Sequence, residues 1–204
     1  MSTVLITATE PEPTRPGSGF VPPCSDDDGR RLAQAALDAT IASVSTVDVA
    51  RTVIVLDPES PLTTGGLEVL RPDADEEDER VGAAVAACDG PLVIVRPWTP
   101  QMGRGLITDA LEALDGPYGD AVVGLTVDGS WWLLGLAEPD PMAVLGLPLR
   151  GAGAGAHLLD RIHGLGLALG LTDRLLAVER LDDAIAVAAE LPGSDFAAVV
   201  SSVG

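Results

Sequence analysis

Short runs of apolar and β-branched residues recur along this chain and constrain its fold more than any other feature. Val4–Ala8, Thr52–Leu56 and Pro91–Val95 are such runs, and each is too short to be a typical helix. A strand that is apolar on both sides is typical of a parallel sheet covered by helices on both faces. The pattern therefore predicts an α/β fold.

Segments with helical periodicity fill the gaps between these runs. Ser25 is placed to cap a helix whose first turn is acidic, and further helices are predicted after the acidic run 73–79, around 106–114, from His157 to about Leu169 and from Leu181 to Leu191. Two more strands are predicted at Leu67–Leu70 and Leu175–Val178. This alternation predicts one three-layer domain over residues 1–204, with a mostly parallel sheet.

A hairpin is predicted near the middle of the chain. Ala121–Val127 and Trp131–Leu136 flank Asp128-Gly129, a strong turn signal, so the sheet should be mixed rather than purely parallel. Trp131 and Trp132 are neighbours in a strand and must point to opposite faces. At most one of them can line a pocket, and core packing is favoured for both.

Charge excludes several classes of partner. The 204 residues carry a formal net charge of -19, and all 12 basic residues are arginine. Such a surface repels nucleic-acid phosphates and anionic membranes, and the lack of lysine excludes Schiff-base chemistry. A sugar nucleotide or other charged small molecule would need a cation or a local arginine cluster to bind here.

Cysteine content and the N-terminus predict a cytoplasmic protein. Cys24 and Cys88 do not make a disulfide framework and are interpreted as thiols in a reducing compartment. The first ten residues lack the pattern of a signal peptide, and no apolar run approaches the roughly 20 residues of a membrane span.

The ligand-binding edge of such a sheet is formed by the loops that follow its strands. Here these loops are 9–23, 96–103 and the Asp128 turn. The glycine-rich run 150–157 lacks the dinucleotide-binding spacing and is interpreted as a flexible connection. His157 and His163 lie six residues apart, on different helical faces, which argues against a shared metal site.

One motif resembles a known family. Asp120–Leu136, D-A-V-V-G-L-T-V-D-G-S-W-W-L-L-G-L, is similar to the D-V-V-x-G-P-x-x-D-G-G-Y-x-L-I-G-L signature of bacterial glycosyltransferase-A-like proteins. That family is labelled as of unknown function or as an arsenosugar-biosynthesis glycosyltransferase. The resemblance implies the nucleotide-diphospho-sugar transferase fold, which is a Rossmann-like mixed sheet with helices on both faces.

The chain departs from this family where the chemistry should be. The family's first loop carries a lysine where this chain has Thr9, and Arg15 is the only basic residue nearby. After the strand at Pro91–Val95 the family has an aspartate that would hold a divalent metal, and this chain has Trp98. Tryptophan cannot bind a hard cation. The resemblance implies Mg²⁺ or Mn²⁺, but these replacements disfavour both, and no metal ligands or other cofactor are predicted.

The candidate site residues follow from the resemblance and from these loops. Asp128 would orient or deprotonate an acceptor hydroxyl, unless it serves only as a turn residue. Trp98 would stack on a base or sugar, or plug a pocket that has lost its metal. The remaining candidates are predicted to bind substrate, and the arginines among them would neutralise a diphosphate in place of a metal: Arg15, Arg80, Arg96 and Trp131.

Three functions remain open at this stage. The first is a glycosyltransferase-like protein for which metal-dependent transfer is disfavoured. The second is a non-catalytic descendant, a pseudoenzyme that acts as a homodimer or binds a protein partner. The third is a nucleotidyltransferase, which needs the same cation. The lost lysine and aspartate favour the second over canonical transfer, because a departing diphosphate needs charge stabilisation.

Overall fold

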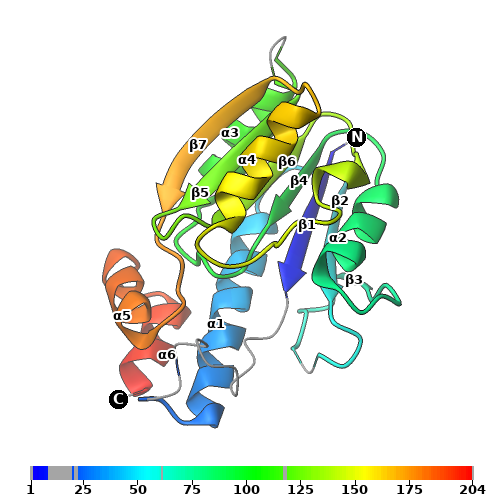
Figure 1. Ribbon diagram of the computed structural model, residues 1–204. Helices are drawn as coiled ribbons and strands as arrows, with labels where there is room; N and C mark the ends of the chain where they lie inside the picture. The colour runs from blue at the N-terminus through cyan, green and yellow to red at the C-terminus, as the bar shows by residue number, and fades with distance from the viewer. Residues whose placement is uncertain (1, 9–19, 21–22, 61, 117–118, 204) are drawn as a thin grey trace.

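A seven-stranded sheet organises the part of the chain that the computed structural model describes, which is residues 2–8, 20, 23–60, 62–116 and 119–203 (Figure 1). The strand order is β3-β2-β1-β4-β6-β5-β7. The strands are β1 (Thr3–Ala8), β2 (Arg51–Leu56), β3 (Glu68–Leu70), β4 (Leu92–Val95), β5 (Ala121–Thr126), β6 (Trp131–Leu136) and β7 (Leu169–Leu175).

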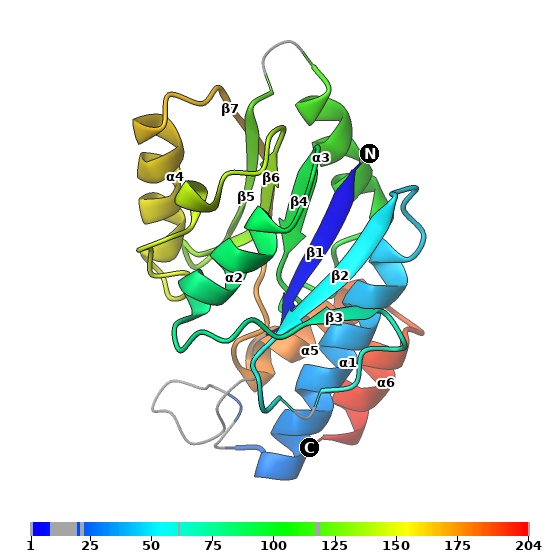
Figure 2. The same cartoon turned by 90° about the vertical axis from the view of Figure 1, so that its right-hand side faces the viewer.

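Helices cover both faces of this sheet. Four helices do so: α1 (Asp26–Val44), α2 (Glu77–Ala86), α3 (Arg104–Leu114) and α4 (Ala154–Gly164). Two more helices, α5 (Leu181–Glu190) and α6 (Asp195–Ser202), pack beside the sheet, and a 3-10 turn lies at Pro141–Ala143. Figure 2 shows α1 and α3 on one face, and α2 and α4 on the other. The predicted three-layer α/β fold is therefore confirmed.

The sheet is mixed, as the hairpin predicted. β1 pairs in parallel with β2 and β4, while β6 runs antiparallel to both β4 and β5. The central strands alternate between the two cores: Leu5 packs with α2 and α4, and Val4 and Ile6 pack with α1 and α3. All three side chains have no exposed surface, which explains why the sequence of β1 is apolar on both sides.

The Asp128-Gly129 turn joins β5 to β6. The Thr126 amide donates to the Ser130 carbonyl at 3.0 Å, and Gly129 has a φ of +92°. A β-carbon on Gly129 would lie 2.5 Å from the Ala152 carbonyl oxygen. The turn therefore needs glycine both for its conformation and for its contact with the segment before α4.

Trp131 and Trp132 pack on opposite faces, as predicted. Trp131 belongs to the core under α2 and α4, and Trp132 to the core under α1 and α3. Both rings are buried, and the Trp132 indole donates to the Asp173 carbonyl at 3.0 Å. Gly124 on β5 leaves room for the Trp132 ring, because a β-carbon there would lie 2.5 Å from the indole Cε2 and Nε1.

Two predicted boundaries near the C-terminus are wrong. The helix expected from His157 to Leu169 begins at Ala154 and ends at Gly164, because Gly166 takes a φ of +72° and turns the chain. The last strand is Leu169–Leu175, not Leu175–Val178. It lies at the edge of the sheet and is only partly buried, so its sequence lacks the apolar run that identifies a central strand.

A third core lies beside the carboxyl ends of the central strands. The N-terminal half of α1 packs there against α5 and α6, around Leu32, Ala36 and Phe196. α6 is not predicted from the sequence, and Ser194 caps it by accepting a hydrogen bond from the Ala197 amide at 3.1 Å. None of the helices in the described part of the chain is long and apolar enough to cross a membrane.

Candidate functional site

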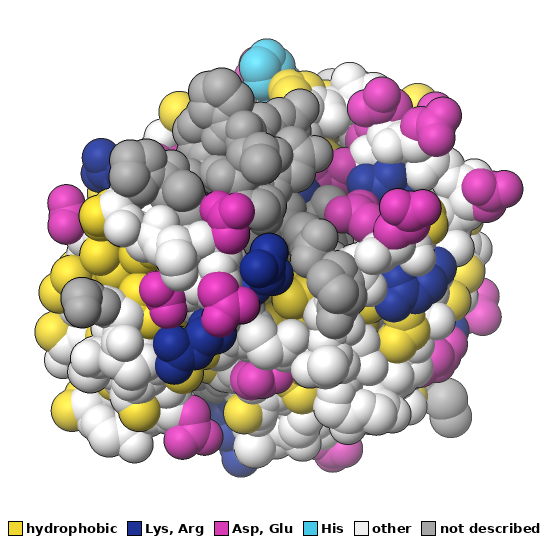
Figure 3. All heavy atoms as spheres, turned by 90° about the horizontal axis from the view of Figure 1, so that it is seen from below, with side chains coloured by type: hydrophobic (Ala, Val, Ile, Leu, Met, Phe, Trp, Pro, Cys, Tyr) yellow, Lys and Arg dark blue, Asp and Glu magenta, His cyan; other side chains and the backbone are white. Residues whose placement is uncertain are grey.

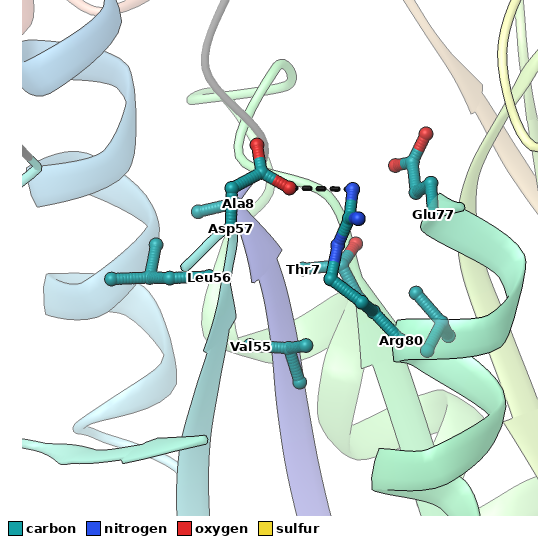
Figure 4. Close-up of a pocket in the computed structure, with 8 residues that line it drawn as sticks. Thr7, Ala8, Val55, Leu56, Asp57, Glu77 and Arg80 are labelled. Carbon is teal, nitrogen blue, oxygen red and sulfur yellow. Dashed lines mark ion pairs between the residues drawn. The ribbon is translucent and has the colours of Figure 1, made fainter. Parts of the chain in front are cut away.

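A hollow of about 190 Å³, counted out to open solvent, lies where β1 and β2 end (Figure 4). Its walls come from the last residues of these strands and from the first turn of α2, and they include Thr7, Asp57, Glu77 and Arg80. The carboxyl ends of the parallel strands meet here because the crossover connections place successive strands side by side in one direction. This is the edge at which the sequence predicts a ligand.

Arg80 and Asp57 form the polar centre of the hollow. The Arg80 Nη2 lies 2.6 Å from the Asp57 Oδ1, and both side chains are mostly buried. The Arg80 Nη1 donates to the carbonyls of Ala74 at 2.9 Å and Asp75 at 2.7 Å, which fixes the guanidinium against the segment before α2. The pair therefore presents a pre-oriented donor and acceptor side by side.

Thr7 adds a polar group that has no partner in the described structure. It is the penultimate residue of β1, its side chain is 3% exposed, and its Oγ1 makes no hydrogen bond to the described residues. A buried hydroxyl without a partner carries a desolvation cost of about 1–3 kcal/mol. A ligand that hydrogen-bonds to Thr7 would recover this cost.

Arg96 lies immediately after β4 and ties several segments together. Its side chain is 6% exposed, its Nη1 donates to the Leu149 carbonyl, and its Cζ lies 5.2 Å from the centroid of the Trp131 ring. Its Nη2 is 3.7 Å from the Glu77 Oε1, which is an ion-pair distance and not a hydrogen bond. The Nε of Arg150 donates to the other oxygen of Glu77 at 2.6 Å.

Burial and neighbouring charge act against each other at Arg96. Burial holds the pKa of its guanidinium below the usual value, and the Glu77 carboxylate opposes this shift. Arg150 adds to the lowering, while Glu179 and Asp128 oppose it. Five charged groups from separate segments are thus close enough to interact at the carboxyl edge of the sheet.

Two of the groups that interact with Arg96 are the carboxylates of Asp128 and Glu179. Asp128 on the β5–β6 turn and Glu179 just before α5 are both exposed. Partial burial raises the pKa of Glu179, and the charge of Asp128 raises it further. Two neighbouring exposed carboxylates, one of which has a raised pKa, are an arrangement suited to binding a hydroxyl group.

The predicted site residues are only partly brought together. Arg80 lines the hollow and Arg96 lies beside it, but Arg96 is committed to contacts within the protein. Trp131 is a core residue under Arg96, and its indole nitrogen has no hydrogen bond to the described residues. Trp98 is half-buried beside the segment before α5, where its carbonyl accepts from the Val178 amide at 2.7 Å. Arg15 lies outside the described residues.

The residues present do not fit the divalent cation that the family resemblance implies. Trp98 takes the place of the expected aspartate, and the buried guanidinium of Arg96 at the end of β4 would repel a cation. The described residues hold no group of three or more His, Cys, Asp or Glu side chains arranged to bind a metal ion. The positive charge at this edge comes from arginine.

Sequence reasoning missed four residues of this site. Thr7 and Asp57 end or directly follow apolar strands, so the rule that ligands bind at the carboxyl ends of strands identifies both. Glu77 is hidden in the acidic run 73–79, which the sequence predicts to be a solvated helix start. Arg150 is 73 residues from Glu77 in the chain, and no local pattern connects the two.

Comparisons with known proteins agree with this fold. A protein from Desulfovibrio desulfuricans G20, described as a nucleotide-diphospho-sugar transferase, superimposes with a TM-score of 0.83 at 16% identity, over 98% of this chain and 94% of that one. The 2-C-methyl-D-erythritol 4-phosphate cytidylyltransferase from Thermus thermophilus has a TM-score of 0.59 at 16% identity, over 92% and 97%. CMP:2-keto-3-deoxy-manno-octonic acid synthetase, complexed with CTP, has a TM-score of 0.63 at 13% identity, over 94% and 99%.

These identities are low, so the structural likeness shows the fold and not the activity. It confirms the Rossmann-like, nucleotide-diphospho-sugar transferase fold that the motif at Asp120–Leu136 implies. No match is found among curated proteins. A family model matches residues 40–147, just over half of the chain, and includes the whole of that motif. The chain belongs to the family described as "Uncharacterized protein conserved in bacteria (DUF2064)".

Proposed function

We propose that this protein is glycosyltransferase-like and holds the nucleoside part of a sugar nucleotide in the hollow at the ends of β1 and β2. The observation that carries the proposal is the Asp57–Arg80 ion pair at 2.6 Å, which lines the same hollow as Thr7, whose Oγ1 has no hydrogen-bond partner among the described residues. A carboxylate accepts hydrogen bonds from ribose hydroxyls or base N–H groups, and a guanidinium donates to base carbonyls. The hollow is small and opens to solvent, so it would hold one part of a larger ligand, with the rest lying along the adjoining edge of the sheet.

The acceptor would approach from the opposite side of Arg96. Asp128 is exposed there and orients an acceptor hydroxyl, with Glu179 nearby as the second carboxylate. Arginine, and not a divalent cation, offsets the charge of the ligand's phosphates at this edge. Arg80 and Arg96 are the described arginines that our sequence analysis assigns to this task.

A binding measurement on Asp57→Asn tests the nucleoside pocket. This change keeps the shape of the side chain and removes the charge that faces Arg80. We expect uridine or cytidine to bind the wild-type protein by calorimetry, and Asp57→Asn to weaken the binding about tenfold or more, because a hydrogen bond to a charged group is lost. Asp109→Asn, on the exposed surface of α3, is the control. If neither nucleoside nor the corresponding nucleotides bind, the proposal fails.

Nucleotidyl transfer is the second candidate reaction, and the two cytidylyl-transferring neighbours favour it. The products distinguish the two reactions. Glycosyl transfer from a sugar nucleotide releases a nucleoside diphosphate, whereas nucleotidyl transfer from CTP to a sugar phosphate or sugar acid releases pyrophosphate. Detection of either product by phosphorus NMR, and its loss in Asp128→Asn, assigns the reaction.

A non-catalytic, partner-binding role is the third candidate. β7 is an edge strand, and Leu171 on it is 64% exposed. Val127, whose amide donates to the Leu175 carbonyl of β7, is 63% exposed. An exposed edge with apolar side chains can pair with another chain. Nucleotide binding without turnover, together with self-association that Leu171→Lys abolishes, would favour this role.

A further inference from the structure

Two arginines converge on one carboxylate next to the hollow. The Glu77 Oε2 accepts from the Arg150 Nε at 2.6 Å, and the Glu77 Oε1 lies 3.7 Å from the Arg96 Nη2. The arginines come from the end of β4 and from the segment before α4, so only the fold brings them together. Paired guanidinium groups around one anion are the arrangement that proteins use to bind phosphate.

Other groups close to Glu77 also favour an anion at the edge of the hollow. Glu77 is the first residue of α2, where the helix dipole favours negative charge. It also lines the hollow with Thr7, whose buried Oγ1 lacks a partner among the described residues. In Figure 4 the Glu77 carboxylate stands at the same open edge as the Asp57–Arg80 pair.

The charge of the whole chain makes such a subsite necessary for an anionic ligand. The net charge is -19, and Figure 3, seen from the carboxyl ends of the central strands, shows arginines gathered in small groups among acidic side chains. The Glu77 side chain can leave the arginines by a change of rotamer, without movement of the helix backbone. Two guanidinium groups would then face the ligand.

We propose that Arg96 and Arg150 form an anion subsite for a phosphate or diphosphate group. When no ligand is bound, the Glu77 carboxylate occupies this subsite. The inference rests on the proposed function, because the phosphate would belong to the nucleotide whose nucleoside occupies the hollow. The subsite supplies from arginine the charge that a metal ion supplies in other transferases. It also makes Glu77 a competitor of the ligand.

Calorimetric titration of the full chain with inorganic pyrophosphate, in buffer with EDTA, tests the subsite. Glu77→Gln removes the competing charge, and we expect it to bind pyrophosphate about tenfold more tightly than the wild type, because one competing charge-assisted contact is gone. Glu79→Gln is the matched control, since it removes the same charge from the same helical turn, at a position that is exposed to solvent. We expect it to change the affinity less than about threefold, because solvent and salt screen an exposed charge.

A second substitution shows whether the gain passes through the arginines. Glu77→Gln combined with Arg150→Gln should lose the gain, in a double-mutant cycle. An equal gain in Glu77→Gln and Glu79→Gln assigns the effect to net charge and overturns the subsite, as does no gain in Glu77→Gln. Thermal melting checks folding; if Glu77→Gln does not fold, Glu77→Asp, which draws the carboxylate back, should give a smaller gain, and its absence overturns the subsite.

The same titrations with uridine separate this inference from the proposed function. Uridine carries no phosphate, so Glu77→Gln should not give uridine the tenfold gain in affinity that it gives pyrophosphate, and Glu79→Gln should leave the affinity for uridine unchanged. If pyrophosphate behaves as expected and uridine binds none of the proteins, the nucleoside pocket is wrong and the anion subsite stands. If uridine binds and Glu77→Gln gives no gain for pyrophosphate, the subsite alone is wrong.

Discussion

The Arg96 guanidinium lies over the Trp131 ring, with its Cζ 5.2 Å from the ring centroid. Both side chains are buried, at 6% and 2% exposure. This distance is within the range of cation–π attraction, which is stronger when water is excluded. The contact joins the end of β4 to the start of β6, and the same guanidinium reaches Glu77 on α2.

Replacement of Arg96 should cost more stability than replacement of an exposed arginine. Arg96→Met keeps most of the side-chain volume but removes the charge that faces Glu77, and we expect a loss of about 3 kcal/mol in the free energy of unfolding. Arg104→Met on the surface of α3 should change it by less than about 0.5 kcal/mol. Urea denaturation measures both, and equal losses would contradict the role of Arg96 as a buried tie.

Tryptophan fluorescence should report mainly on Trp98 when acrylamide is the quencher. Trp131 and Trp132 are buried in separate cores, and Trp98 is half-buried on the loop after β4. We expect Trp98→Phe to remove most of the quenchable emission, because acrylamide reaches only exposed rings. Trp132→Phe is the comparison. Quenching that persists unchanged in Trp98→Phe would show that one of the strand tryptophans is accessible.

Gly129→Ala should destabilise the hairpin by two separable effects. The residue has a φ of +92°, and a β-carbon there would lie 2.5 Å from the Ala152 carbonyl oxygen. Gly151 has a similar φ of +87° with no atom within 4 Å, so Gly151→Ala isolates the conformational strain, which costs about 1 kcal/mol. Gly129→Ala should cost about 3 kcal/mol, strain and contact combined. Equal losses on thermal or urea unfolding would rule out the contact.

Glu179→Gln should alter the pH dependence of stability. Burial and Asp128 raise the folded-state pKa of Glu179 above the ordinary 4.5, so the unfolded state loses its proton first. Stability is therefore lost as the pH rises through and above 4.5, and glutamine removes this loss. We expect the melting temperature of Glu179→Gln, relative to that of the wild type, to increase as the pH is raised from 4 to 7. Asp182→Asn, on the exposed first turn of α5, is the control, and an identical pH profile for Glu179→Gln and wild type would contradict the shift.

Much of the fold is predictable from local sequence. The strands at β1, β2 and β4 are apolar because helices cover both of their faces, and Ser25 caps α1 through a hydrogen bond from the Asp28 amide at 3.2 Å. The Asp128-Gly129 turn follows from the φ that only glycine adopts readily. β7 is not predictable in this way, because an edge strand is covered less and keeps no apolar pattern.

The candidate site, like the fold, is only partly predictable from the sequence. The sequence predicted that a ligand would bind at the carboxyl ends of the strands, and it showed that arginine is the only strongly basic residue available there. Only the tertiary structure decided which arginines face which acids: Arg80 meets Asp57, while Arg96 and Arg150 share Glu77. The reason is physical, because parallel strands joined by crossover helices bring together residues that are far apart in the chain. No local periodicity records those contacts.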